Sequence, residues 1–421
     1  GQRRPYHPAN VFAHHWGVVC IAIIRGAAVC IWGNRGPLCG CFFEAMSGLT
    51  TTGSTVLSGL ETLPKGLLLW RGILQWLGGI GIIVVAMVFL PELRVGGMQI
   101  FKAEAFDTLG KILPRATTIS IQISFIYVSI TMACIVAYFS VGMSAFDATV
   151  HAMTTVATGG FSNYDASFAA FPAAVEYVAV VFMILAALPF VRYVQLLNGN
   201  QTAVFKDAQV RSFLTVIFVL VVITALILLS FGQLENETAV RKALFNITSI
   251  ISGTGYASSD YMQWGSFLVT LFFFIGLIGG CAGSTACSVK IFRYQLVFAS
   301  VKTQLMKIKS PNGVFVPQYD GRAIDDEVLS SVMSFFTFFL ATLGAVAVLL
   351  GMTGLDFITS LSAAASALAN IGPGLGPEIG PTGNFSGLND TAKWILSAAM
   401  LIGRLELLAV YAILTVQFWR A

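Results

Sequence analysis

Long apolar runs alternate with short, half-polar segments along most of this chain. A helix that crosses a bilayer needs about 20 mostly apolar residues. Runs of about that length or more lie at 67–90, 117–142, 173–197, 210–232, 264–298, 327–352 and 391–418. A further candidate, 11–32, is poorer because His14, His15 and Arg25 are costly at membrane depth. The pattern predicts an all-α polytopic membrane protein.

Four half-polar segments recur between these runs, and each reads as a short helix that ends in a cluster of glycines. They are FFEAMSGLTTTGSTV (42–56), FDATVHAMTTVATGGFS (146–162), VRKALFNITSIISGTGY (240–256) and LDFITSLSAAASALANIGPGLG (355–376). The clusters centre on Gly53, Gly159, Gly255 and Gly372. Such segments are too short to span, and non-helical backbone survives at membrane depth only where protein or water covers it. We therefore predict four parallel helix–pore-helix–helix repeats around a pseudo-fourfold central pore.

The repeats also suggest boundaries and an orientation. We expect an atypical N-terminal segment with a first outer helix at 1–41, the rest of repeat 1 with a cytoplasmic link at 42–116, repeat 2 at 117–209, repeat 3 with a cytoplasmic loop at 210–326, and repeat 4 at 327–421. Thirteen of the 24 Lys and Arg residues lie in 91–116, 190–212 and 289–328. The positive-inside rule places these segments in the cytoplasm.

Composition narrows the class of protein. Only 10% of the residues are charged, against roughly 25% in soluble proteins, so a soluble enzyme is excluded and a lipid membrane is expected. A net charge of +4 is too small to indicate a nucleic-acid partner. No H-E-x-x-H motif occurs, and we expect His151 to be a packing residue rather than a catalytic base. The seven cysteines form no C-x-x-C pair, so we expect neither a disulfide framework nor a zinc site.

The four glycine clusters suggest cation chemistry if they meet on one axis. A ring of backbone carbonyl oxygens can replace the hydration shell of a potassium ion, and glycine reaches the backbone angles that turn successive carbonyls inward. The C-terminal ends of the preceding helices favour a cation, and Asp147 and Asp356 are placed to cap two of the outer helix ends. Ordinary small-residue packing between helices is the alternative, but four clusters at matching places argue against it.

The segments TTTGSTV, ATGGFSNYDAS, SGTGY and NIGPGLGPEIGPTGNFSGL, together with QWLGGIGIIV at 75–84, resemble the Trk/Ktr/HKT superfamily of potassium uptake proteins, and within it the TrkH type. The resemblance covers about residues 42–421. It implies a potassium filter formed by Thr51–Thr52–Gly53, Ala157–Thr158–Gly159, Gly253–Thr254–Gly255 and Asn370–Ile371–Gly372. Members with glycine at all four positions prefer potassium, whereas serine in the first repeat goes with sodium permeation. The implied ligand is transported K⁺, with no covalently bound cofactor.

A run of small residues interrupts the second helix of repeat 3. Its members are Gly276, Gly279, Gly280, Gly283, Ser284 and Thr285. Glycine weakens a helix by about 1 kcal/mol per residue relative to alanine, so the run indicates either close helix packing or a broken, mobile helix. The resemblance implies an intramembrane gating loop here, although Cys287 and Ser288 stand where the family commonly has small glycines.

Arg404 follows Lys393 by eleven residues, which places it near the membrane midplane. An arginine at that depth indicates a functional site; pairing with Glu406 or snorkelling to a surface is the alternative. The resemblance implies that Arg404 lies in the pore beneath the filter as an electrostatic barrier.

The resemblance also implies an assembly. It suggests a homodimer in the bacterial cytoplasmic (inner) membrane, with loops 91–116 and 299–328 docking a nucleotide-binding TrkA-type regulatory ring. The alternative function is that of a sodium- or proton-coupled secondary transporter. Repeats of such transporters are usually inverted, whereas these four run in the same orientation.

Overall fold

The computed structural model describes residues 38–88, 116–232, 234–405, 407 and 410–411. The expected first outer helix at 11–32 and nearly all of the loop 91–116 lie outside these residues. The described chain is mostly helical, and the only strands within it are two pairs of two residues each. The predicted all-α fold is confirmed.

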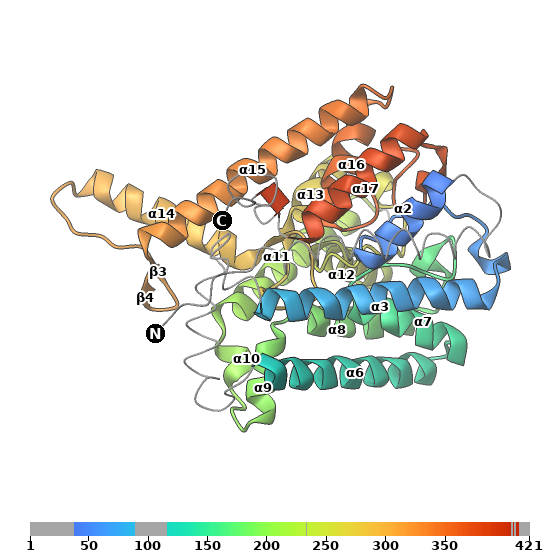
Figure 1. The fold of residues 1–421 in the computed structure, drawn as a ribbon, viewed down its shortest axis with the longest axis horizontal. Helices are drawn as coiled ribbons and strands as arrows, with labels where there is room; N and C mark the ends of the chain where they lie inside the picture. Colours follow the sequence, from blue (N-terminus) through green and yellow to red (C-terminus); the bar gives the residue numbers. More distant parts are fainter. Residues whose placement is uncertain (1–37, 89–115, 233, 406, 408–409, 412–421) are drawn as a thin grey trace, which may run out of the picture.

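Long apolar helices form the frame of the molecule (Figure 1). They are α3 (Lys65–Val88), α6 (Ala116–Ser140), α11 (Ala208–Ser230) and α15 (Asp326–Gly351), and the shorter α17 (Asp390–Arg404) belongs to repeat 4. Among the described residues, α6, α11 and α15 are long and apolar enough to cross a membrane as single helices. Each begins and ends within about two residues of a predicted run, because the apolar stretch itself sets the length of a spanning helix.

The apolar pattern predicts one helix over the run 173–197, but the structure has two helices there. Helix α8 (Ala173–Ala187) and helix α9 (Phe190–Leu197) meet at an angle of 88°. Pro189 follows the bend, and a residue before proline avoids the helical region, as Leu188 does with ψ 157°. The bend frees the backbone carbonyl groups at the end of α8 for bonds to another segment.

The helix of repeat 3 is interrupted where the small residues predict. Helix α13 (Ser266–Gly276) ends at the first of them, and α14 (Ile291–Lys309) begins after a non-helical loop. Within the loop, β1 (Ile278–Gly279) pairs in parallel with β2 (Val289–Lys290). The loop is thereby closed at its base, with its tip free to reach other elements.

Four short helices, here called the pore helices, lie among the long ones. They are α2 (Leu38–Leu49), α7 (Ala145–Val156), α12 (Asn236–Ile251) and α16 (Phe357–Ala369). Each also contacts a helix of the neighbouring repeat: α7 packs on α3, α12 on α8, α16 on α13, and α2 on α17. Because the last contact returns from repeat 4 to repeat 1, the four pore helices form a closed circle.

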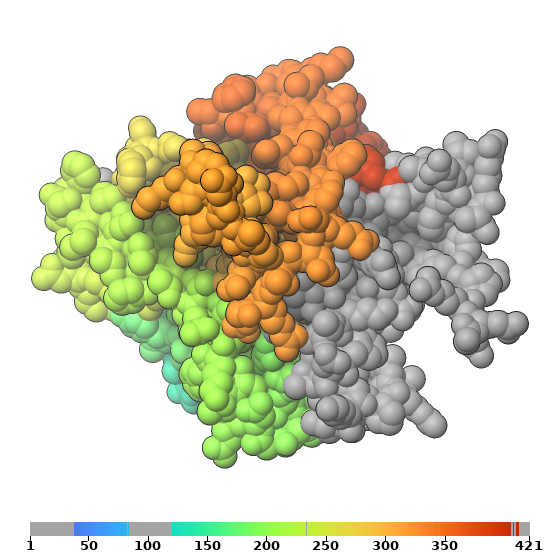
Figure 2. Space-filling view, turned by 90° about the vertical axis from the view of Figure 1, so that its left-hand side faces the viewer, coloured from blue at the N-terminus to red at the C-terminus, as the bar shows by residue number. Residues whose placement is uncertain are grey.

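Shorter elements complete the chain. Single 3₁₀ turns are η1 (Leu60–Thr62), η2 (Ser167–Ala170), η3 (Tyr261–Trp264) and η4 (Phe385–Gly387), and α10 (Ala203–Lys206) precedes α11. Beyond α14, β3 (Gln318–Tyr319) and β4 (Arg322–Ala323) form an antiparallel hairpin. Helix α14 and this hairpin project from one end of the bundle (Figure 1), and they stand forward in orange when that end is viewed directly (Figure 2).

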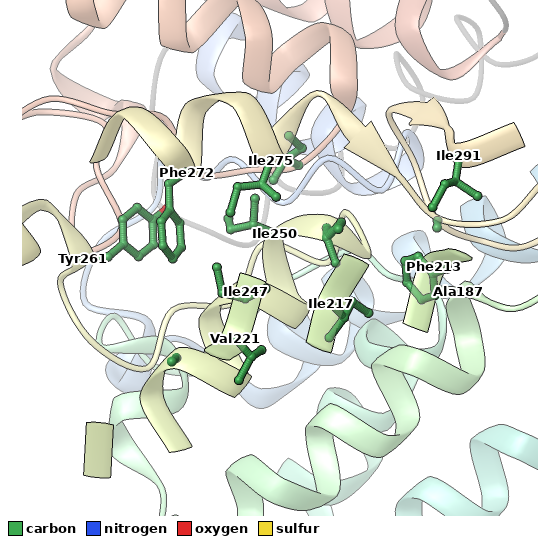
Figure 3. Packing of buried hydrophobic residues seen from close by; sticks show 14 of the residues in the cluster. Ala187, Phe213, Ile217, Val221, Ile247, Ile250, Tyr261, Phe272, Ile275 and Ile291 are labelled. Atoms are coloured by element: carbon green, nitrogen blue, oxygen red, sulfur yellow. The ribbon is translucent and has the colours of Figure 1, made fainter. Parts of the chain in front are cut away.

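The largest buried apolar cluster lies between repeats 2, 3 and 4. Figure 3 shows Phe213 and Ile217 of α11, Ile250 of α12 and Ile275 of α13 within this cluster, with Phe272 of α13 stacked on Tyr261. This cluster fixes α12 against its flanking helices and therefore the end of that pore helix.

Two details differ from what the sequence indicates. Cys41 is disulfide-bonded, although the spacing of the cysteines gives no sign of a disulfide. Asp356 caps α16 as predicted, accepting a bond from the Thr359 N–H, but the N-cap of α7 is Ser144. Asp147 lies three residues further on and bonds the Ser144 hydroxyl instead, because a capping box uses both positions.

Candidate functional site

All four pore helices end in the same backbone turn. A residue one or two positions past each helix end is left-handed, with φ between 50° and 75°: these are Thr51, Thr158, Gly253 and Asn370. Its N–H bonds the carbonyl three residues back, and the next N–H bonds the carbonyl five residues back, in each of the four turns. This is the Schellman ending of a helix. Because all four helices end in the same way, the chain leaves each of them in the same direction relative to its helix.

Two residues later each turn has a second left-handed residue, and all four are glycines. These ring glycines are Gly53, Gly160, Gly255 and Gly372. In the second repeat the matching position is therefore Gly160, one residue beyond the sequence-based triplet that ended at Gly159. The sequence ATGGF has two adjacent glycines and does not show which of them is the ring glycine. The backbone angles show that it is Gly160.

The ring glycines touch one another's turns in cyclic order. A Cβ atom would collide with the carbonyl oxygen of the next turn: from Gly53 with Gly159, from Gly160 with Thr254, from Gly255 with Ile371, and from Gly372 with Thr52. The fourth contact closes the circle. Left-handed backbone and lack of space both require glycine at these positions.

The four carbonyl oxygens at these contacts occupy equivalent positions. Within the described part of the chain, those of Thr52, Thr254 and Ile371 accept no hydrogen bond, whereas that of Gly159 accepts one from the Gln75 side chain. Buried carbonyl groups in proteins are nearly always bonded. Three such unbonded groups facing a common ring are available to a ligand.

Side chains join neighbouring turns across the repeats. Gln75 of α3 donates to Gly159 O and accepts the Phe161 N–H, so one amide fixes both sides of the second turn. Asn370 donates to the Thr52 hydroxyl over 2.9 Å, joining repeat 4 to repeat 1. These bonds fix the second turn against α3 and the fourth turn against the first.

A cavity of about 170 Å³ lies over the ring glycines, all four of which line it. The residues that follow the glycines form its wall, together with Arg71 and Asp165. Arg71 is buried, pairs with Glu44 over 2.8 Å and donates to Ser162 O over 3.0 Å. Its charge is therefore neutralised beside the cavity rather than offered to it.

The broken-helix loop between α13 and α14 contacts the residues that precede the ring glycines. Cys287 Sγ lies 3.6 Å from the Thr51 hydroxyl, and a Cβ at Gly253 would lie 3.0 Å from Cys287 N. Ser288 N–H donates to Ala369 O at the end of α16. The loop thus lies against three of the four turns, on the side away from the cavity.

The loop is held in place by the bend in repeat 2. Thr285 donates its N–H and its hydroxyl to Ala186 O, and Cys281 N–H donates to Ala187 O. Phe190, the first residue of α9, donates its N–H to Gly283 O. The carbonyl groups freed at Pro189 are those that bind the loop, which sequence patterns did not predict.

Arg404 lies at the end of α17 and is 8% exposed. Its guanidinium lies 2.7 Å from Cys287 Sγ and donates to Thr285 O over 3.4 Å and to Gly78 O over 3.2 Å. The alternative partner Glu406 lies outside the described residues. Arg404 therefore joins α3, α17 and the loop at one point beneath the turns.

The remaining loop residues chosen from sequence are placed as follows: Gly276 is the last residue of α13, Gly279 is in β1, and Gly280, Gly283 and Ser284 are buried in the loop with Thr285. Sequence reasoning missed Gly160 as a ring glycine and Gln75 and Cys287 as contacts. Gln75 heads the segment QWLGGIGIIV and Cys287 departs from the family pattern, so both carried a signal.

Known proteins match this chain over most of its length. The family model described as TrkH, cation transport protein, matches residues 33–418. The Trk system potassium uptake protein TrkI of Halomonas elongata is 45% identical over 90% of this chain and 77% of its own. The Trk system potassium uptake protein TrkH of Escherichia coli is 37% identical over 90% of this chain and 79% of its own.

A solved structure agrees with these matches. The crystal structure of the potassium transporter TrkH from Vibrio parahaemolyticus matches with a TM-score of 0.90 and 32% identity, over 100% of this chain and 88% of that one. Members of this family are transporters, so the expectation that the protein is not an enzyme is confirmed. The chain is a multi-pass membrane protein and belongs to the TrkH family of cation transport proteins.

Proposed function

We propose that this protein takes up potassium through the ring of four turns, which acts as its selectivity filter. The carrying observation is that the turns close a circle with equivalent carbonyl oxygens, three of them without a hydrogen bond in the described chain. Relatives at 37–45% identity are named potassium uptake proteins. The filter in this proposal uses Gly160 in place of Gly159 as the ring glycine of repeat 2.

The chemistry is the replacement of water by backbone oxygen. A potassium ion that enters from the cavity sheds water, and the carbonyl groups at Thr52, Gly159, Thr254 and Ile371 take its place. The four pore helices point their C-terminal ends at the ring, which favours a cation. The pairing of Arg71 with Glu44 keeps a net positive charge away from the entrance.

In the same proposal, the loop 277–290 and Arg404 close the path beneath the ring. Cys287 contacts Thr51 and Gly253 on one side and Arg404 on the other. A buried guanidinium there repels a passing cation and also holds the loop in position. Opening then requires the loop to leave Arg404 and the bend at Pro189.

The assembly is part of this proposal. Because the relatives are named as parts of a Trk system, we expect a homodimer in the bacterial inner membrane and a TrkA-type nucleotide-binding ring as partner. In this proposal the ring docks at the end from which α14 and the hairpin β3–β4 project (Figure 2).

The direct test is ion flux into liposomes that hold the purified protein, with a potassium gradient and sodium as competitor. Selective potassium flux without a sodium or proton gradient supports the proposal. Flux that requires either gradient would replace it with a coupled transporter, and equal flux of sodium and potassium would reject the filter.

A further inference from the structure

One buried polar side chain on each pore helix bonds the segment that leaves the ring. In all four repeats, the third residue after the ring glycine donates its backbone N–H to this side chain. The pairs are Val56 with Glu44, Asn163 with His151, Ser258 with Asn246, and Leu375 with Ser362. We call Glu44, His151, Asn246 and Ser362 the brace residues. Each is at most 4% exposed.

In repeat 1 the brace is ionic. Glu44 accepts the Val56 N–H over 2.9 Å and the Thr55 hydroxyl over 3.0 Å. Arg71 donates to the same carboxylate over 2.8 Å and to Ser162 O over 3.0 Å in repeat 2. This brace therefore ties its own outgoing segment and that of the next repeat to α3.

In repeat 2 the brace is a neutral imidazole. His151 Nδ1 lies 2.9 Å from Asp147 O, and because a carbonyl only accepts, Nδ1 carries the proton. Nε2 is then the acceptor for the Asn163 N–H at 3.4 Å and for the Ser162 hydroxyl at 3.1 Å. The sequence suggested that His151 is a packing residue. In this tautomer its Nε2 also accepts the backbone N–H of the outgoing segment, as a brace residue does.

Repeats 3 and 4 use an amide and a hydroxyl. Asn246 Oδ1 accepts the Ser258 N–H over 3.2 Å while Nδ2 donates to the Ser258 hydroxyl over 3.0 Å. Ser362 Oγ accepts the Leu375 N–H over 2.9 Å and donates to Leu375 O over 2.8 Å. Both side chains bond the same residue twice, so they fix its orientation as well as its distance.

The separation along the chain is 12 residues in three repeats and 13 in the fourth. Four chemically different side chains thus make the same kind of hydrogen bond at equivalent positions. This indicates that the hydrogen bond is what the structure needs there, and not a particular residue type. The brace acts three residues beyond the ring glycine, so it sets where that glycine lies relative to its neighbours.

We infer that the brace residues are positioning residues that hold the four ring glycines at the separation that distinguishes potassium from sodium. None of them is among the residues whose carbonyl groups are proposed to bind the ion. This inference rests on the proposed function, since it assigns a cause to the selectivity proposed there. If the braces served folding alone, removing one would lower stability and leave selectivity unchanged.

The test compares two serine-to-alanine variants on α16. Ser362→Ala removes a brace, whereas Ser360→Ala removes a buried hydroxyl that bonds Leu355 O away from the ring. Ser362→Ala removes both hydrogen bonds to Leu375, and we expect it to lower the potassium-to-sodium flux ratio at least about fivefold, as loss of even one hydrogen bond of ordinary strength implies. Ser360→Ala should keep the wild-type ratio. Equal ratios in the two variants would overturn the inference.

A second pair of variants guards against misfolding. Asn246→Asp keeps the acceptor for the Ser258 N–H and loses the donor to Lys242 O and to the Ser258 hydroxyl, whereas Asn246→Leu removes acceptor and donor at similar volume. The ratio should be retained in the former and lost in the latter, with thermal unfolding of both recorded. A wild-type protein without selectivity would reject the proposed function itself, whereas a selective wild type with four unaffected variants would reject only the braces.

Discussion

The two sides of the ring are built on different plans. On the cavity side, four outgoing segments are held by four side chains at equivalent places. On the other side, a single loop from repeat 3 and a single arginine from repeat 4 meet beneath the turns. An ion on the central axis is surrounded by all four repeats, so a selective site needs equivalent groups from each repeat. A single element is enough to block the same path. The comparison assigns selectivity to the repeated side and gating to the unique side.

The largest expected effect comes from adding a side chain to the ring. Gly53→Ser places a Cβ against Gly159 O at a left-handed φ of 88°. The Cβ cannot fit there unless the first and second turns move apart, so we expect the potassium-to-sodium flux ratio to fall about tenfold or more. Sodium competition in the liposome assay measures it.

The control for this variant is Gly142→Ala, which also has a left-handed φ, of 103°, but open space around it. It should lose some stability and keep its selectivity. An equal loss of selectivity in both variants would mean that backbone strain, and not contact within the ring, explains the effect.

Arg404→Ala tests the gating side of the ring, where the loop and the arginine meet. It removes a positive charge and the bonds to Thr285 O and Gly78 O, so potassium flux should rise several-fold while the flux ratio stays unchanged. Arg404→Lys keeps the charge and should raise flux less. A fall in flux with correctly folded protein would contradict the barrier role.

Cys287→Ala should have a smaller effect in the same direction. It removes the contacts of the thiol with Thr51 and with the Arg404 guanidinium, but it leaves the bond from Arg404 to Thr285 O and the bonds at Ala186 and Ala187. Cys281→Ala, another buried thiol of the same loop, is the matched control. If both variants raise flux equally, the contact beneath the ring is not what holds the loop.

The smallest effect is expected outside both regions. The pKa of Asp356 is lowered by hydrogen bonding to Thr359 at the start of α16. Its stabilising contribution is therefore present above the ordinary carboxyl pKa and is lost as pH falls through the lowered value. Asp356→Ala should reduce stability by about 1 kcal/mol, remove this pH dependence from thermal unfolding, and leave the flux ratio unchanged. A changed flux ratio in Asp356→Ala would mean that the outer end of a pore helix, and not only the brace residues, contributes to selectivity.

Sequence alone predicted the spanning helices because apolar length and glycine content are local properties. It also found four turns, three of them in the register that the backbone angles give. The second was one residue off, because Gly159 and Gly160 are adjacent and only φ separates them. The bend at Pro189 was hidden within a continuous apolar run, and the bonds it frees for the loop join residues about 100 positions apart. The brace of His151 depends on a tautomer that no pattern encodes.

The most direct measurement is to locate a heavy potassium analogue, rubidium, in crystals of the protein by anomalous scattering. The account predicts a peak enclosed by the carbonyl groups at Thr52, Gly159, Thr254 and Ile371, and a weaker one in Gly53→Ser. Rubidium bound elsewhere along the path, with none within the ring, would contradict it.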